Sequence, residues 1–282
     1  MKPNGPDLPA IPSKRDKRLD RALNLSNIAS MDDTDDFAEL PRTEHGGSAE
    51  LLHATVAREL GIAIIQGRHV AGELLPSELT AIQTLKISRP AYREGIRMLA
   101  AKNLVEIRPK SGTRVLPRSQ WNLLDPDVLG WILQNNPPEV FQTALFDVRM
   151  IIEPAAAALA AQRRTQSHLD QMAEALEVMR NQHHDSPEGQ AADEMFHRVL
   201  LDAADNEILS KLASLIGASV TYIAEYKRAR EVRRDPTPDH EALFRAIAAR
   251  RSEAARLVVS NLIEHARQDT EGLFGEGAAA GE

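Results

Sequence analysis

Cysteine is absent from all 282 residues of the chain. Disulfide bridges, thiolate nucleophiles and cysteine-based zinc sites are therefore excluded. No apolar run approaches the roughly 20 residues that a helix needs to cross a bilayer. The amino terminus also lacks the apolar stretch of a secretory signal. These absences predict a cytoplasmic protein, and a hydrophobic fraction of 43% is enough for a sizeable core.

Negative charge dominates the whole chain, at −7, but it is unevenly distributed. Residues 50–118 hold 11 Lys and Arg against 6 Asp and Glu, whereas residues 119–282 hold 16 against 26. A basic module joined to an acidic one is typical of a DNA-binding domain followed by a regulatory domain. Proline-rich and charge-rich residues 1–48 cannot bury enough apolar surface to offset their ordering entropy, so we expect a disordered tail there.

Three helices are predicted in the basic module. Apolar residues recur at helical spacing over 51–65. A short helix is expected over 78–85. A third helix is expected over about 88–102, because Ser88 is a favourable N-cap residue and Pro90 suits a first turn.

A hairpin is predicted directly after these helices. Residues 104–108 and 113–116 are β-prone, and the Pro-Lys-Ser-Gly sequence at 109–112 is a turn signal. Three helices followed by a hairpin predict a winged helix-turn-helix over residues 49–117.

Beyond residue 117 the sequence predicts helices only. A linker helix is expected within 118–136, and an antiparallel bundle of six or seven helices within 137–273. Thr165, Asn206, Thr237 and Ser252 are the expected N-caps of four of these helices. Residues 274–282 are expected to form a second disordered tail. The fold class is thus mainly α.

Arginines are spaced along one face of the third predicted helix. Arg89, Arg93 and Arg97 lie four residues apart, and a helix that enters the major groove needs cations on its outer face. For any single arginine, a solvated surface position explains the sequence equally well. The ordered set with a turn before it and a wing after it favours DNA binding. The predicted DNA contacts are Ser88, Arg89, Arg93, Arg97, Lys110 and Gly112.

The basic module resembles the GntR family of bacterial regulators. The resemblance lies in Leu75-Pro76-Ser77-Glu78 and Ile87-Ser88-Arg89-Pro90-Ala91-Tyr92-Arg93-Glu94. The remainder resembles the FadR subfamily, whose helical effector domain is called FCD. The sequences at 119–125 and 148–154 are most similar to sugar-acid (galactonate-type) operon repressors of that subfamily. One departure is Leu79, where some relatives have an arginine that contacts DNA.

A metal site is implied by the same resemblance. Asp193 and His197 are spaced i, i+4, so they share a helix face, and with His240 they offer a carboxylate and two imidazoles. Spacing alone would also fit a surface pair or a core histidine, but all three match FCD ligand positions. The donors suit zinc, or else nickel or manganese. The fourth family ligand is expected near Leu262, where this chain has no histidine. We expect three protein ligands plus water or effector; the alternatives are that His265, one turn further on, reaches in, or that no metal binds.

An effector site is expected beside that metal. Arg149 lies in an otherwise apolar helix, where it either pairs with a carboxylate such as Glu153 or, as the resemblance implies, binds a ligand carboxylate. Tyr222 and Tyr226 could line the same cavity, although core packing explains them equally well.

A regulator is therefore the predicted function, and the alternatives remain open. We expect a cytoplasmic, nucleoid-associated bacterial homodimer that binds a palindromic operator in double-stranded DNA. We expect it to repress carbon catabolism until a sugar acid, or another acid such as lactate or a fatty acid, releases it. One alternative is a metal-dependent enzyme fused to a winged helix, although no general base accompanies the metal residues. The other is an architectural DNA-binding protein without a ligand.

Overall fold

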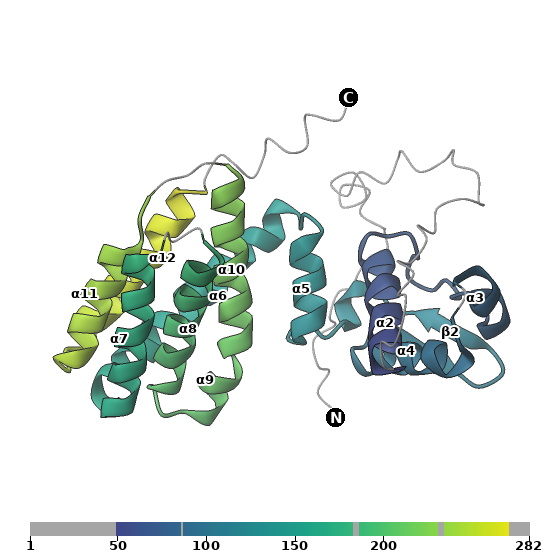
Figure 1. The fold of residues 1–282 in the computed structure, drawn as a ribbon, viewed down its shortest axis with the longest axis horizontal. Coiled ribbons are helices and arrows are strands. Elements are labelled where there is room, and N and C mark those ends of the chain that lie inside the picture. The colour runs from purple at the N-terminus through teal and green to yellow at the C-terminus, as the bar shows by residue number, and fades with distance from the viewer. Residues whose placement is uncertain (1–48, 86, 183–185, 231–233, 271–282) are drawn as a thin grey trace, which may run out of the picture. The chain divides into compact units, whose positions relative to one another are not determined.

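The computed structural model describes residues 49–85, 87–182, 186–230 and 234–270 (Figure 1). Both predicted tails, residues 1–48 and 274–282, lie outside the described residues, and so do residues 271–273 at the end of the predicted bundle segment. No helix in the described ranges combines the length and apolarity needed to span a membrane. The elements are α2 (Ala49–Ile65), α3 (Glu78–Leu85), α4 (Arg89–Ala101), β1 (Val105–Arg108), β2 (Gly112–Val115), a 3-10 turn (Arg118–Gln120), α5 (Pro126–Gln134), α6 (Glu139–Arg163), α7 (Gln166–Asn181), α8 (Pro187–Asp202), α9 (Glu207–Lys211), α10 (Ala213–Ala229), α11 (Thr237–Ala248) and α12 (Ser252–Gln268).

Helices α2, α3 and α4 form the predicted three-helix head. Ser88 caps α4 by accepting a hydrogen bond from the Ala91 backbone N–H, and Pro90 lies in the first turn. The apolar face of α4 is buried through Tyr92, Ile96 and Leu99, among others. Helix α4 packs across α2, where the absence of a side chain at Gly95 permits a close approach to Val56. Burial of this face fixes which side of α4 remains in solvent.

Strands β1 and β2 form the predicted wing. They pair antiparallel, with Val105 opposite Val115 and Arg108 opposite Gly112. The connecting turn holds Lys110 at φ 63° and Gly112 at φ 86°. Only the glycine adopts this left-handed backbone without steric cost. Three residues, 109–111, connect the two strands, and the Lys110 side chain is exposed.

Helix α5, within the range expected for the linker helix, begins at an Asp-Pro pair. Asp125 accepts hydrogen bonds from the backbone N–H groups of Asp127 and Val128. Its carboxylate also receives Lys102 Nζ, from the end of α4, at 2.8 Å. The residue that caps α5 thus also ties this helix to the end of α4.

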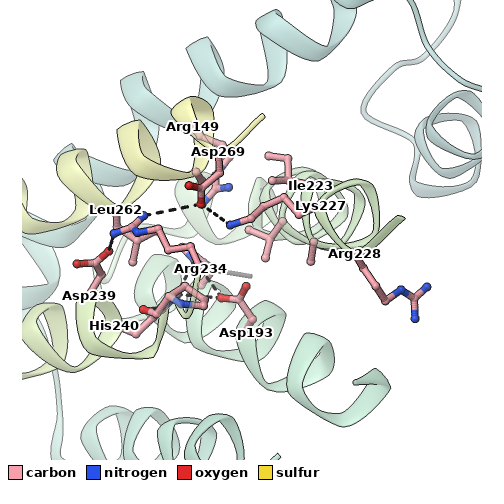
Figure 2. A pocket seen from close by; sticks show the side chains of 15 residues that line it. Arg149, Asp193, Ile223, Lys227, Arg228, Arg234, Asp239, His240, Leu262 and Asp269 are labelled. Atoms are coloured by element: carbon pink, nitrogen blue, oxygen red, sulfur yellow. Dashed lines mark hydrogen bonds and ion pairs between the residues drawn. The ribbon is translucent and has the colours of Figure 1, made fainter. Parts of the chain in front are cut away.

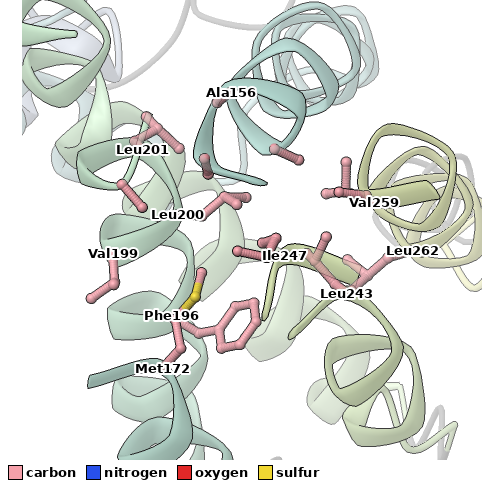
Figure 3. Close-up of a cluster of buried hydrophobic side chains, with 14 of the residues drawn as sticks. Ala156, Met172, Phe196, Val199, Leu200, Leu201, Leu243, Ile247, Val259 and Leu262 are labelled. Atoms are coloured by element: carbon pink, nitrogen blue, oxygen red, sulfur yellow. The ribbon is translucent and has the colours of Figure 1, made fainter. Parts of the chain in front are cut away.

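Seven helices, α6 to α12, follow in the described part of the chain and share one apolar core. Helix α6 contacts α8, α11 and α12, and its alanines, such as Ala156 and Ala160, are fully buried. Phe196 of α8, Ile247 of α11 and Val259 of α12 converge on the same core (Figure 3). The small side chains of α6 allow these neighbours to approach closely.

Two of the four predicted N-caps are confirmed. Thr165 caps α7, and Asn206 caps α9. The other two were wrong by one residue, because Thr237 and Ser252 are themselves the first residues of α11 and α12. At α11 the capping acceptor is instead the side chain of Asp235, which receives the Thr237 backbone N–H at 2.9 Å.

Candidate functional site

The outer face of α4 carries the three predicted arginines in solvent. Arg89 and Arg97 have side-chain exposures of 67% and 64%, and Arg93 is also exposed. Arg89 lies 3.8 Å from Glu78, a loose contact, whereas Arg97 pairs with Glu94 at 3.2 Å. Pairs this exposed contribute little to stability and leave the guanidinium groups available to other partners.

The cavity in the bundle contains the predicted metal-ligating residues. Asp193 and His197 extend from α8 and His240 from α11, and one ligand atom of each lies within 4.8 Å of the others. The two imidazole Nε2 atoms are 3.3 Å apart. They lie 3.5 Å (His197) and 2.9 Å (His240) from the same oxygen, Asp193 Oδ1. Residues 43 positions apart in sequence thus point three donor atoms at one place.

The second ring nitrogen of each histidine, Nδ1, lies against a partner on the side away from the cluster. His197 Nδ1 lies 2.6 Å from Glu153 Oε2, and His240 Nδ1 lies 2.9 Å from the Pro236 carbonyl. Such partners fix the ring orientation and direct Nε2 toward a metal. Asp193 Oδ1 is buried and lies within 3.5 Å of both Nε2 atoms. Two oriented imidazoles and one carboxylate oxygen that converge in this way are a donor set that fits a divalent cation.

Glu153 is the residue that connects the metal-ligating cluster to Arg149. Its side chain is fully buried, and its other oxygen, Oε1, receives Arg149 Nε at 2.6 Å. Burial by itself raises the pKa of Glu153, but Arg149 and His197 lower it to about 2. Burial lowers the pKa of His197, but Glu153 and Asp193 raise it to about 9. Without a metal, the buried charges therefore balance as alternating cations and anions.

Arg149 pairs with Glu153, which confirms the first of the two interpretations. It also lines the cavity together with Asp193, His197 and His240, while its binding of a ligand carboxylate stays a prediction. Only 2% of the residue is exposed. A buried arginine that is fixed through its Nε by a carboxylate keeps its terminal nitrogens for a further acceptor.

The mouth of the cavity is filled by ion pairs that the sequence did not predict (Figure 2). Lys227 Nζ, from α10, lies 2.5 Å from Asp269 Oδ2, just after α12. Arg234 lies 3.8 Å from the same oxygen and 2.6 Å from Asp239. The free space that remains is about 60 Å³. No local pattern indicated these residues, because they come from the end of α10, the start of α11 and the end of α12 and meet only in the folded chain.

His265 does not join the metal-ligating cluster. Its Nδ1 lies 2.6 Å from Arg234 and 3.1 Å from Asp239, and its side chain is 40% exposed. Leu262, at the expected position of the fourth ligand, lines the cavity. Because His265 is one turn beyond that position, it reaches the ion pairs at the mouth instead.

Tyr222 and Tyr226 lie outside the cavity, contrary to the expectation. The cavity side of α10 is formed by residues such as Ile223 and Lys227. Tyr222 instead packs against a smaller apolar cluster containing Leu129 and Leu145, and Tyr226 stacks on Arg230 at 3.5 Å. At 100° per residue, neighbours in the sequence of a helix face different directions, which separates the tyrosines from the cavity.

Comparison with known proteins identifies both halves of the chain. Residues 52–115 match the gntR family of bacterial regulatory proteins, and residues 144–265 match the FCD domain. The galactonate operon transcriptional repressor of Escherichia coli is 34% identical over 206 residues, which cover 72% of this chain and 90% of the relative. The chain is a GntR-family transcriptional regulator of the FadR type. Families and relatives alike are regulators, so the regulator is not an enzyme.

Two further likenesses extend this comparison. LutR of Bacillus subtilis, a helix-turn-helix regulator, is 31% identical to the regulator over 66% of this chain and 90% of the relative. The solved structure of Lar, which controls expression of the Listeria monocytogenes agr system, has a TM-score of 0.55 at 17% identity. It covers 80% of this chain and 97% of that chain, and it shows the likeness of fold alone.

The two buried ion pairs that Glu153 makes, with Arg149 and with His197, lead to a prediction about stability. Replacing Glu153 by Gln leaves two buried cationic partners without their counter-charge, so we expect the free energy of unfolding to fall by about 3–5 kcal/mol. Urea unfolding followed by circular dichroism measures this loss.

Glu177→Gln is the matched control, because it removes an exposed carboxylate that pairs with Arg180 on α7. We expect this change to have little or no effect. Equal unfolding midpoints for the two variants would contradict the role assigned to Glu153.

Proposed function

We propose that the regulator is a dimeric repressor of a bacterial carbon-catabolism operon, and that a sugar acid releases it from DNA. The observation that carries this proposal is the bundle cavity, where buried Arg149 lies beside the converging Asp193, His197 and His240. Arginine binds carboxylates through two parallel hydrogen bonds. Hydroxyl and carboxylate oxygens of a sugar acid are also suitable metal ligands. The names of the galactonate and Uxu operon relatives support a sugar-derived acid.

The DNA-binding step uses the outer face of α4. Its N-terminal arginines would enter the major groove, where one arginine can bind O6 and N7 of guanine. Lys110, beside Gly112 in the wing turn, would reach a DNA phosphate or the minor groove. Two copies would read the halves of a palindromic operator, because the twofold symmetry of a dimer matches that of such a sequence.

A divalent metal would be held by Asp193, His197 and His240. The metal, proposed to be zinc with nickel or manganese as alternatives, would supply a positive charge that attracts an anionic effector. Glu153 and the Pro236 carbonyl keep the imidazoles oriented for that purpose. Arg149 would bind the carboxylate of the effector from the neighbouring wall of the cavity.

Release from DNA requires that the effector favours one arrangement of the protein over another. A coupling free energy of about 1–3 kcal/mol would change operator affinity by roughly 5–150-fold. The helices that would contact the metal and the effector, α6, α8 and α11, pack on one shared apolar core, so a change at the cavity would act on several helices at once.

The DNA-reading face is tested with Arg93→Ala. On a DNA sequence selected by the wild-type protein from a random library, we expect a loss of about 1–3 kcal/mol in binding free energy, because one base contact is removed. Fluorescence anisotropy with labelled duplexes measures the affinity. Arg256→Ala, which removes an exposed arginine of α12, is the control and should bind like wild type. Unchanged sequence selectivity in Arg93→Ala would refute this placement.

The metal site is tested by elemental analysis of protein purified without chelators. We expect about one divalent ion per chain in the wild type and none in His240→Ala, which removes one of only three donors. His265→Ala should keep the ion, because His265 contacts Arg234 and Asp239 instead of the cluster. Loss of the ion in His265→Ala but not in His240→Ala would overturn this ligand assignment.

The effector class is tested on the complex with the selected DNA. We expect D-galactonate to weaken DNA binding by roughly 5–150-fold, and we expect galactitol, its uncharged counterpart, to have no effect. Gluconate, glucuronate, lactate and hexanoate complete the panel. Release by lactate or hexanoate alone would reassign the effector class. If no acid changed DNA binding, the proposed function would fail.

A further inference from the structure

A carboxylate of the protein itself occupies the mouth of the effector cavity. Asp269 Oδ2 lies 2.5 Å from Lys227 Nζ and 3.8 Å from Arg234 Nη1. The Asp269 side chain is 15% exposed and that of Lys227 11%. Both residues line the same cavity as Arg149, Asp193 and the two histidines (Figure 2). Lys227 and Arg234, two cations in the cavity wall, thus share one carboxylate of the protein itself, Asp269.

The position of Asp269 at the end of its own helix is electrostatically unfavourable. It is the C-cap of α12, where its backbone N–H donates to the carbonyls of His265 and Arg267. The C-terminal end of a helix carries partial negative charge, so a carboxylate there is electrostatically unfavourable. The ion pair with Lys227, which comes from a different helix, offsets that repulsion. The contact is therefore one that a competing acid can replace without breaking a favourable cap.

Lys227 and Arg234 already face a carboxylate while Asp269 is present. Asp269 Oδ2 lies 2.5 Å from Lys227 Nζ and 3.8 Å from Arg234 Nη1, so an incoming carboxylate competes with it for these two cations. Arg234 keeps its second partner, Asp239, when Asp269 leaves.

We propose that Asp269 is a built-in competitor of the effector, which the carboxylate of the incoming acid displaces from Lys227 and Arg234. The proposal rests on the proposed function, because it assumes that this cavity binds an acid. Displacement of Asp269 frees the end of α12, and this links occupancy of the cavity to the position of that helix. Lys227 and Arg234 then belong to the effector site together with Arg149.

Replacing each partner of the Lys227–Asp269 ion pair in turn distinguishes competition with the effector from a simple structural role. Asp269→Asn keeps the shape of the side chain and removes its charge, whereas Lys227→Gln removes the cation that the effector needs. Competition predicts opposite effects on affinity. A purely structural ion pair predicts that both variants change affinity in the same direction.

The experiment is a calorimetric titration of the full-length protein with D-galactonate. We expect Asp269→Asn to bind about tenfold more tightly than wild type and Lys227→Gln about tenfold more weakly, each near the 1.4 kcal/mol that one decade represents. Glu264→Gln, a carboxylate-to-amide change on α12 outside the cavity lining, should match wild type. Unfolding curves of all variants establish that each is folded. Equal or weaker binding by Asp269→Asn would overturn the proposal.

A second measurement follows the end of α12 directly. Because the chain has no cysteine, Gln268→Cys provides a single site for a nitroxide label on an exposed residue next to Asp269. We expect D-galactonate to increase label mobility in the wild-type background, and we expect Asp269→Asn to be mobile without ligand. Binding of D-galactonate with no change in mobility would refute displacement. Absence of any binding to wild type would instead count against the proposed function.

Discussion

The buried chain of charges from Arg149 through Glu153 to His197 is the constraint on which the cavity depends. Three ionisable groups with almost no solvent exposure are tolerable only because each lies about 2.6 Å from a partner of opposite charge. Glu153 extends from α6 beside the fully buried Ala156 and Ala157, so this geometry is supported by the apolar core of the bundle. The same carboxylate fixes both the guanidinium and the imidazole, and it therefore orients the two groups that an acidic effector would meet.

The two functional surfaces are built on opposite principles. On α4 the arginines project into solvent and are held only loosely, as the proposed DNA-reading face requires, because such a face must exchange its partners. In the bundle the polar groups are buried and held from behind, so that donor atoms remain in place before a ligand arrives. In both cases, the burial of an apolar face decides where the functional face points. For α4 this face includes Tyr92 and Leu99, and for α8 it includes Phe196.

The interactions at the mouth of the cavity differ from those at its base. Glu153 has no exposure, whereas Lys227, Asp269 and Arg234 have side-chain exposures between 11% and 34%. Partly solvated ion pairs exchange at a lower free-energy cost than fully buried ones. A rigid base and an exchangeable mouth suit a sensor, because the first gives selectivity and the second gives a response.

The sequence by itself determined the elements and their chemistry. Local capping signals such as Ser88 and Asp125, the arginine spacing on α4, and the i, i+4 pair Asp193 and His197 depend only on neighbours within one turn or one helix. Tertiary structure alone decided which distant residues meet. It joined His240 to that pair, turned Tyr222 away from the cavity, placed His265 among the ion pairs, and brought Asp269 to Lys227. These contacts follow from how helices far apart in the chain pack against each other, which no local pattern encodes.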